Sequence, residues 1–175
     1  MAEQTVDAYA TALFGVASAE GDLDEVSDEL FRFARTLDTN DELRDALSDP
    51  HIPASRRQQI VEDLLGGRAH PITTTLVSMV VGAGRARDLP AIIDELVALG
   101  AAEGNREVAE VRSAVALTDD QKQRLAAALE AATGKKVELK VVIDPTVLGG
   151  LVAQVGDTVI DGSVKARLQQ LQTAF

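Results

Sequence analysis

Glycines and aspartates cluster in the segment LGGLVAQVGDTVIDGSV, residues 148–164, and these residue types can bind phosphates or cations. Glycine lets backbone amides approach a phosphate closely, and aspartate supplies oxygen ligands to calcium. The spacing fits neither kind of site. The glycines do not form G-x-G-x-x-G, and in a calcium loop that begins at Asp157 two ligand positions would be Val159 and Leu168. The segment therefore predicts turns between short strands.

A second candidate for phosphate binding is TGKK, residues 133–136, which resembles the end of a phosphate-binding loop. That loop requires a glycine five residues before its second glycine, where this sequence has Leu129. It also requires serine or threonine after the lysine, where this sequence has Lys136. The pattern favours a helix that ends at Gly134 and is followed by a strand.

Residues for nucleophilic or metal-dependent catalysis are scarce. The chain has no cysteine and two histidines, His51 between prolines and His70 directly before Pro71, where it is expected to cap a helix. Carboxylates are abundant, but no spacing pairs two of them for acid–base catalysis. We therefore expect no catalytic residue, no metal site and no cofactor. An enzyme that uses two carboxylates in a cleft stays open as an alternative.

The overall charge restricts the possible partners. The sequence carries 28 acidic and 17 basic residues, a formal net charge of −11, which disfavours nucleic acid and anionic lipid and is compatible with a basic protein partner. Hydrophobic residues make up 46% of the chain, enough for a packed core. The acidic N-terminus does not resemble a secretory signal, and the longest apolar stretch, residues 72–83, is too short to span a membrane.

Helical periodicity dominates the first hundred residues. Val6, Tyr9, Leu13 and either Val16 or Ala17 form one apolar stripe. A second stripe combines Leu23, Val26, Leu30, Phe33 and Leu37. Further helices are expected after Asn40, at residues 53–65 and 71–83, and from Pro90 onward, each with capping or proline signals at its start. These stripes need partners, so we expect a six-helix bundle.

The period changes near residue 105. Alternation over residues 109–117 and 137–143 predicts two strands, separated by a helix that begins with a capping box of Thr118 and Gln121. Two short strands, 151–155 and 158–160, form a hairpin, and a last helix follows Ser163 with Val164, Leu168 and Leu171 on one face. The fold class expected is α+β, mainly α, with a helical domain at 1–104 and a small β-α-β-β-β-α domain at 105–175.

Several motifs together resemble one family. They are YATALFGVA at 9–17, LRDALSDPHIP at 43–53, GRARDLPAII at 84–93, TGKKVEL at 133–139, then DP, GG and GDTVIDGSV in the last third. This set, in this order, is similar to the delta subunit of rotary F-type ATP synthases, the family of the mitochondrial oligomycin-sensitivity-conferring protein. The resemblance covers nearly the whole chain.

The resemblance implies a non-catalytic stator subunit of a proton-translocating ATP synthase. In that family the helical domain binds N-terminal helices of the alpha subunits, and the C-terminal domain binds the C-terminal end of the b-subunit stalk. It implies a peripheral position on the cytoplasmic side of a bacterial membrane, reached only through the complex. The alternative is an unrelated acidic adaptor protein of the same architecture.

The resemblance also implies positions for the contacts. The alpha-binding surface of the family maps onto Tyr9, Ala12, Leu13, Val16, Thr75, Leu76, Met79 and Val80, of which Ala12, Thr75 and Met79 are the best candidates for an outward face. Leu13 and Leu76 fit an ordinary core equally well. In the C-terminal domain Val142, Val152 and Val164 are candidates for an exposed apolar face, with packing in the core as the favoured alternative for each. The family's signature turns and helix cap are expected at Asp144, Gly149, Gly150, Gly156, Asp157, Asp161, Gly162 and Ser163.

Overall fold

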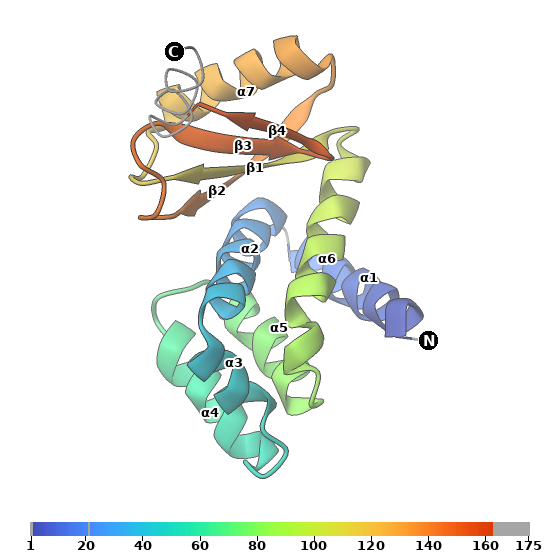
Figure 1. Ribbon diagram of the computed structural model, residues 1–175. Coiled ribbons are helices and arrows are strands. Elements are labelled where there is room, and N and C mark those ends of the chain that lie inside the picture. The colour runs from blue at the N-terminus through green and yellow to red at the C-terminus, as the bar shows by residue number, and fades with distance from the viewer. Residues whose placement is uncertain (1, 21, 163–175) are drawn as a thin grey trace. The chain divides into compact units, whose positions relative to one another are not determined.

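The computed structural model describes residues 2–20 and 22–162. The chain forms two compact units that divide after Gly100, called here the N-terminal unit and the C-terminal unit. Helices make up the N-terminal unit, and a four-stranded mixed sheet with one described helix makes up the C-terminal unit (Figure 1). This mainly helical α+β fold agrees with the fold class that the sequence predicts.

The helices of the N-terminal unit follow one another through short connections. They are α1 (Ala2–Glu20), α2 (Leu23–Thr39), α3 (Asp41–Ser48), α4 (Ala54–Leu65), α5 (Pro71–Gly82), the short 3-10 helix η1 (Ala86–Asp88) and α6 (Leu89–Glu103), which continues across the unit boundary. Capping residues and prolines in the sequence explain where several of these helices begin. The Asn40 side chain accepts a hydrogen bond from the Leu43 amide at 3.0 Å, and Pro71 occupies the first turn of α5. The predicted cap at Asn40 is confirmed.

The core of this unit lies along the facing sides of α2, α5 and α6. Fully buried side chains include Leu30 and Leu37 of α2, Leu76 of α5, and Ile93 and Leu96 of α6. The stripe predicted on α2 is confirmed, since Val26, Leu30, Phe33 and Leu37 are all buried. On α1 the structure decides between the two alternatives at the end of the stripe. There Ala10, Leu13 and Ala17 are buried, whereas Val16 is 44% exposed.

The C-terminal unit is built on a sheet with the strand order β2-β1-β3-β4. The strands are β1 (Glu107–Ser113), β2 (Val137–Ile143), β3 (Leu151–Val155) and β4 (Thr158–Asp161). β1 pairs in parallel with β2 and antiparallel with β3, and β3 pairs antiparallel with β4. Helix α7 (Asp119–Thr133) makes the crossover from β1 to β2, as a parallel pair requires. The predicted last helix lies outside the described residues, with Ser163, Val164, Leu168 and Leu171.

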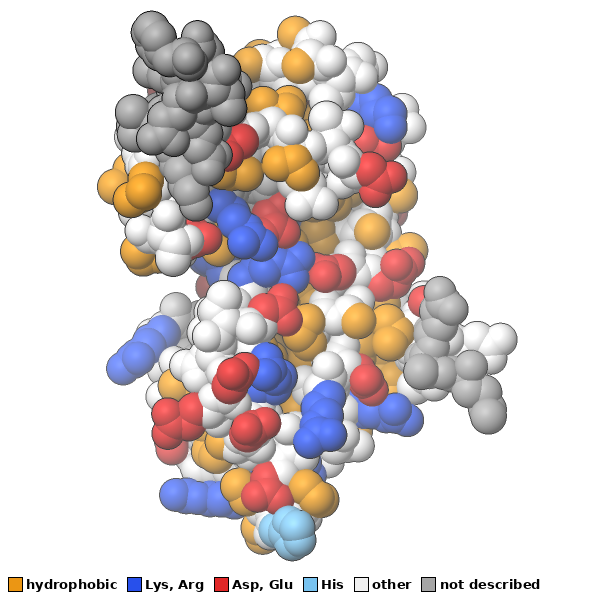
Figure 2. Space-filling model, viewed as in Figure 1, with side chains coloured by type: hydrophobic (Ala, Val, Ile, Leu, Met, Phe, Trp, Pro, Cys, Tyr) orange, Lys and Arg blue, Asp and Glu red, His pale blue; other side chains and the backbone are white. Residues whose placement is uncertain are grey.

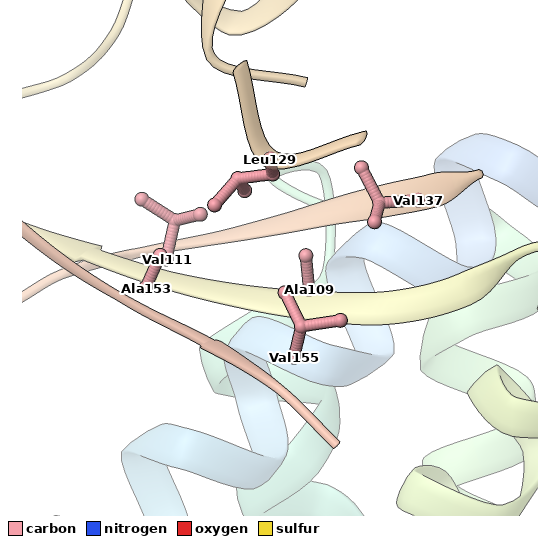
Figure 3. Close-up of a cluster of buried hydrophobic side chains, with 6 residues drawn as sticks. All are labelled: Ala109, Val111, Leu129, Val137, Ala153 and Val155. Atoms are coloured by element: carbon pink, nitrogen blue, oxygen red, sulfur yellow. The ribbon is translucent and has the colours of Figure 1, made fainter. Parts of the chain in front are cut away.

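One face of the sheet packs against α7 (Figure 1). Ala109 and Val111 of β1, Val137 of β2, and Ala153 and Val155 of β3 alternate toward this side and enclose Leu129 (Figure 3). The alternation predicted for residues 109–117 is too long, because β1 ends at Ser113 and Val115 lies in the following loop. Beyond Ser113 the chain turns into the capping box of α7, where Thr118 and Gln121 exchange the two predicted hydrogen bonds.

The hairpin between β3 and β4 places Gly156 in a turn, as the sequence predicts. Val155 pairs with Thr158, so Gly156 and Asp157 form a two-residue loop. Gly156 has φ +55°, a conformation that residues with a Cβ adopt at a cost. Asp161 is the last residue of β4 and pairs with Val152, which corrects its predicted place in a turn. The glycine-rich segment thus shapes the sheet.

The turn after β2 is held by the first residue of the Asp144–Pro145 pair. The Asp144 carboxylate accepts hydrogen bonds from the Thr146 hydroxyl at 2.6 Å and from the Thr146 amide at 2.9 Å, with the Arg112 guanidinium 3.9 Å away. These bonds, the hydroxyl bond first, hold the pKa of Asp144 below its ordinary value because they favour the charged carboxylate. Asp144 therefore closes the turn best when it is ionised.

Thr146→Ala should raise the pKa of Asp144 toward the ordinary value of about 3.9, and Thr146→Ser should not. A folded-state pKa below the unfolded one stabilises the protein above about pH 4, and this contribution disappears as the pH falls through the folded-state pKa. The measurement is an NMR titration of the Asp144 side-chain carboxyl in both variants. An unchanged titration curve in Thr146→Ala would show that the hydroxyl bond does not control this group.

Candidate partner-binding surfaces

Two helices of the N-terminal unit expose short outward strips at the positions that the sequence implied. Ala12 and Val16 lie four residues apart on α1, and both are exposed. Thr75 and Met79 have the same spacing on α5 and are also exposed, Met79 to 55%. Residues four apart share one face of a helix, so each pair forms a short strip, with a small side chain at Ala12 and a flexible one at Met79. We call Ala12 and Val16 the α1 strip, and Thr75 and Met79 the α5 strip.

The other predicted contact residues lie deeper. Leu13 is 4% exposed, and Leu76 and Val80 are fully buried, so these three pack in the core of the N-terminal unit. Tyr9 is half-buried on α1. Leu13 and Leu76 are therefore core residues, which is the alternative that the sequence left open for them. They hold α1 and α5 in position, while the strips face outward.

The start of α5 is joined to α2 by a partly buried polar contact. Glu29 of α2 accepts hydrogen bonds from the His70 amide at 2.8 Å and from the Thr73 hydroxyl at 2.6 Å, and Thr73 is fully buried. The His70 ring caps the helix, since its Nδ1 accepts a hydrogen bond from the Ile72 amide at 3.3 Å. The predicted capping role of His70 is confirmed, and Glu29 is a positioning residue that the sequence analysis missed.

The C-terminal unit exposes apolar side chains at one end of its sheet. Ser113, Ile143 and Leu151 share a row across β1, β2 and β3. Ile143 is 59% exposed, and two further exposed side chains, Val115 (67%) and Leu148 (62%), lie within three residues of this row in the chain. A cavity of about 310 Å³ opens nearby between Leu117, Leu125 and Leu151. We call Val115, Ile143 and Leu148 the sheet-end patch.

Val142, Val152 and Val164 are the residues that the sequence offered for this surface, with a place in the core as the favoured alternative. Val142 and Val152 are half-buried and lie on the sheet face opposite α7, while Val164 lies outside the described residues. Val115 was assigned to a strand, and Leu148 precedes a glycine turn, so periodicity carried no sign that either side chain is exposed. The only sequence signal for such exposure was a large apolar residue directly beside a predicted turn, as at Leu148.

The described residues contain no group of three or more histidine, cysteine, aspartate or glutamate side chains placed to hold a metal ion. His51 is exposed, and its ring lies 3.0 Å from the Asp49 carboxylate. Within the described part of the chain, no helix has both the length and the apolarity needed to cross a membrane. On the face that Figure 2 shows, acidic and basic side chains are interspersed, with apolar side chains between them.

A family model described as "ATP synthase delta (OSCP) subunit" matches residues 6–175. The chain belongs to the ATP synthase delta (OSCP) subunit family. The match covers both units of this delta-family chain, so the family resemblance drawn from the sequence motifs is confirmed. The chain is 45% identical to the ATP synthase subunit delta of Nocardia farcinica over 161 residues and 44% identical to that of Streptomyces griseus over 160 residues.

These alignments cover 92% and 91% of this chain but 60% and 59% of the relatives. The delta-family chain thus spans about three fifths of the length of these curated relatives. Among solved structures, a chain of the Toxoplasma gondii mitochondrial ATP synthase hexamer is similar, with a TM-score of 0.57 and 22% sequence identity. That similarity covers 97% of this chain and 96% of the other, and it supports the fold.

Proposed function

We propose that this chain is a non-catalytic stator subunit of a proton-translocating ATP synthase, and that it links the top of the catalytic alpha/beta head to the b-subunit peripheral stalk. The family match across both units carries this proposal. In this role the chain holds the head against rotor torque so that rotation is coupled to ATP synthesis. It needs no active site, and it reaches the cytoplasmic side of the bacterial membrane only through the complex.

The two units divide the work in this proposal. The N-terminal unit, a six-helix bundle, binds the N-terminal helices of alpha subunits through the α1 strip and the α5 strip. An amphipathic helix can pack its apolar side against small and flexible side chains such as Ala12, Thr75 and Met79. The C-terminal unit, for which the sequence predicts the order β-α-β-β-β-α, binds the C-terminal end of the b subunit. Its sheet-end patch supplies exposed apolar surface for this contact.

The alpha contact can be tested by titration calorimetry with a peptide of the alpha-subunit N-terminus from the same organism. We expect saturable binding that Met79→Arg and Ala12→Arg each weaken by at least about tenfold, because an arginine prevents close packing and carries a charge into the interface. Gln59→Arg is the matched control, since it adds the same side chain at an exposed position of α4.

The possible outcomes test separately whether the chain binds the alpha subunit and whether it does so through the two strips. Failure of the unmodified chain to bind the peptide would contradict the proposed contact with the alpha subunits, while the family membership would stand. Binding that neither arginine variant weakens would keep the role and move the contact to another surface of the N-terminal unit. Equal weakening by Gln59→Arg would indicate a general effect of positive charge.

A further inference from the structure

A cavity of about 350 Å³ lies in the N-terminal unit, away from the α1 and α5 strips. Its lining comes from α2, α3, α4 and the segment after α4, and it includes Arg32, Phe33, Leu43, Leu64, Leu65 and Arg68. None of these residues belongs to either strip. A volume above about 300 Å³ falls within the range of ligand pockets in proteins. We call this feature the α2–α4 cavity.

Apolar side chains make up the larger part of the cavity lining. Phe33 is 7% exposed, and Leu43 and Leu65 are half-buried. Leu64 is 39% exposed, although it is a large apolar side chain beside an open cavity. Covering Leu64 and filling the cavity would remove apolar surface from water, which is favourable in proportion to the area buried.

Two arginines give the cavity a charge opposite to that of the chain. Arg32 and Arg68 are exposed, and within the described residues their side chains make no ion pair and no hydrogen bond. Other arginines are paired, for example Arg44 with Asp41 and Arg85 with Asp88. Two uncommitted guanidinium groups at one cavity are notable in a chain with 28 acidic and 17 basic residues.

The one carboxylate in the lining is already engaged elsewhere. Glu29 Oε2 accepts the bonds from the His70 amide and the Thr73 hydroxyl, which join α2 to the start of α5. Glu29 makes no ion pair with Arg32 or Arg68. An acidic group from outside the chain can therefore pair with these arginines, and guanidinium groups bind carboxylates with two parallel hydrogen bonds.

We propose that the α2–α4 cavity is a second docking site, which takes an acidic amphipathic helix of a partner protein. A large apolar side chain of that helix enters beside Phe33 and Leu64, and carboxylates one turn away pair with Arg32 and Arg68. The charge complementarity and the apolar lining together select this occupant. The site is independent of the alpha contact proposed above, because it uses other helices and other residues.

The test uses the full chain and a synthetic amphipathic peptide of about 16 residues, roughly four helical turns, with leucine on one face and glutamate on its flanks. We expect this peptide to shift the amide signals of the cavity residues in NMR spectra and to bind saturably. Arg32→Glu and Arg68→Glu should each weaken binding by about tenfold, because each replaces an attraction with a repulsion. A peptide with lysine in place of glutamate should bind the variant that carries both Arg32→Glu and Arg68→Glu better than it binds the unmodified chain.

Four further variants serve as controls for this test. Arg87→Glu removes an exposed arginine from η1 in the same unit, outside the cavity, and should leave binding unchanged. Met79→Arg should also leave it unchanged, which separates this site from the alpha contact. Should the glutamate variants not fold, Arg32→Gln and Arg68→Gln remove the charge alone and should weaken binding by a smaller factor.

Three outcomes would overturn the proposal. The first is no binding of the acidic peptide to the unmodified chain. The second is equal weakening by Arg87→Glu, which would indicate nonspecific attraction between charges. The third is binding of dodecanoate at the cavity without binding of the peptide, which would assign the site to a free anionic amphiphile.

Discussion

Replacing Leu129 with alanine should lower the free energy of unfolding of the C-terminal unit by about 3 kcal/mol and leave that of the N-terminal unit nearly unchanged. Leu129 is 3% exposed and is the one buried side chain of α7. It lies over the strands, with Val111 and Val137 beside it (Figure 3). Its removal takes away apolar contact and leaves a cavity.

The neighbours of Leu129 cannot close that cavity easily. Ala109 and Ala153 are short, and they belong to hydrogen-bonded strands in the middle of the sheet. A small unit has little stability in reserve, so a loss of about 3 kcal/mol is a large part of its total. We therefore expect the C-terminal unit to unfold at a clearly lower urea concentration than in the unmodified chain.

The measurement is a urea titration followed by NMR signals assigned to each unit. Leu129→Met is the matched control, because it nearly conserves volume and should cost less than about 1.5 kcal/mol. Equal destabilisation of both units would show that they unfold as one cooperative structure. A loss below about 1 kcal/mol would show that α7 contributes little to the stability of the sheet.

Replacing Glu29 with alanine should lower the free energy of unfolding of the N-terminal unit by about 2–3 kcal/mol. The carboxylate accepts two hydrogen bonds from groups of α5, and its loss leaves the buried Thr73 hydroxyl and the His70 amide without this acceptor. A buried donor that loses its partner costs about 1–3 kcal/mol, and bonds to a charged acceptor are among the stronger ones. Glu29→Gln, which keeps an acceptor oxygen, should cost less.

A double-mutant cycle isolates the contact between α2 and α5. Thr73→Val replaces the hydroxyl with a methyl group, so the combined variant has no unsatisfied hydroxyl. We expect Glu29→Ala with Thr73→Val to be less destabilising than the sum of the two single changes, by about 1 kcal/mol. Urea unfolding followed by N-terminal-unit signals measures each variant. Additive effects would mean that the 2.6 Å contact does not contribute to stability.

Much of the local structure was predictable, because its causes lie within a few residues. The capping box of Thr118 and Gln121, the Asn40 cap and the hairpin at Gly156 each depend on bonds or backbone angles over three or four neighbouring positions. The end of α7 at Gly134 also has a local cause, since the glycine there adopts φ +72°. Such features need no knowledge of distant segments.

Burial was predictable only in part. Periodicity indicated the apolar side of α1 to within one residue, and packing then buried Ala17 and exposed Val16. The stripe on α2 was placed correctly because five large side chains repeat there without interruption. Val115 was placed in a strand because its alternation with Val111 and Ser113 continues past the end of β1. Alternation does not show where the pairing of strands stops.

The sequence by itself determined the family, the mainly helical α+β class, and the starts and ends of most described elements, because motifs and caps are local. Only the tertiary structure decided which side chains meet across long intervals. Glu29 and Thr73 are 44 residues apart in the chain and form one hydrogen bond. Arg32 and Arg68 come to one cavity from α2 and from the segment after α4. These placements depend on how helices pack, which no short stretch of sequence encodes.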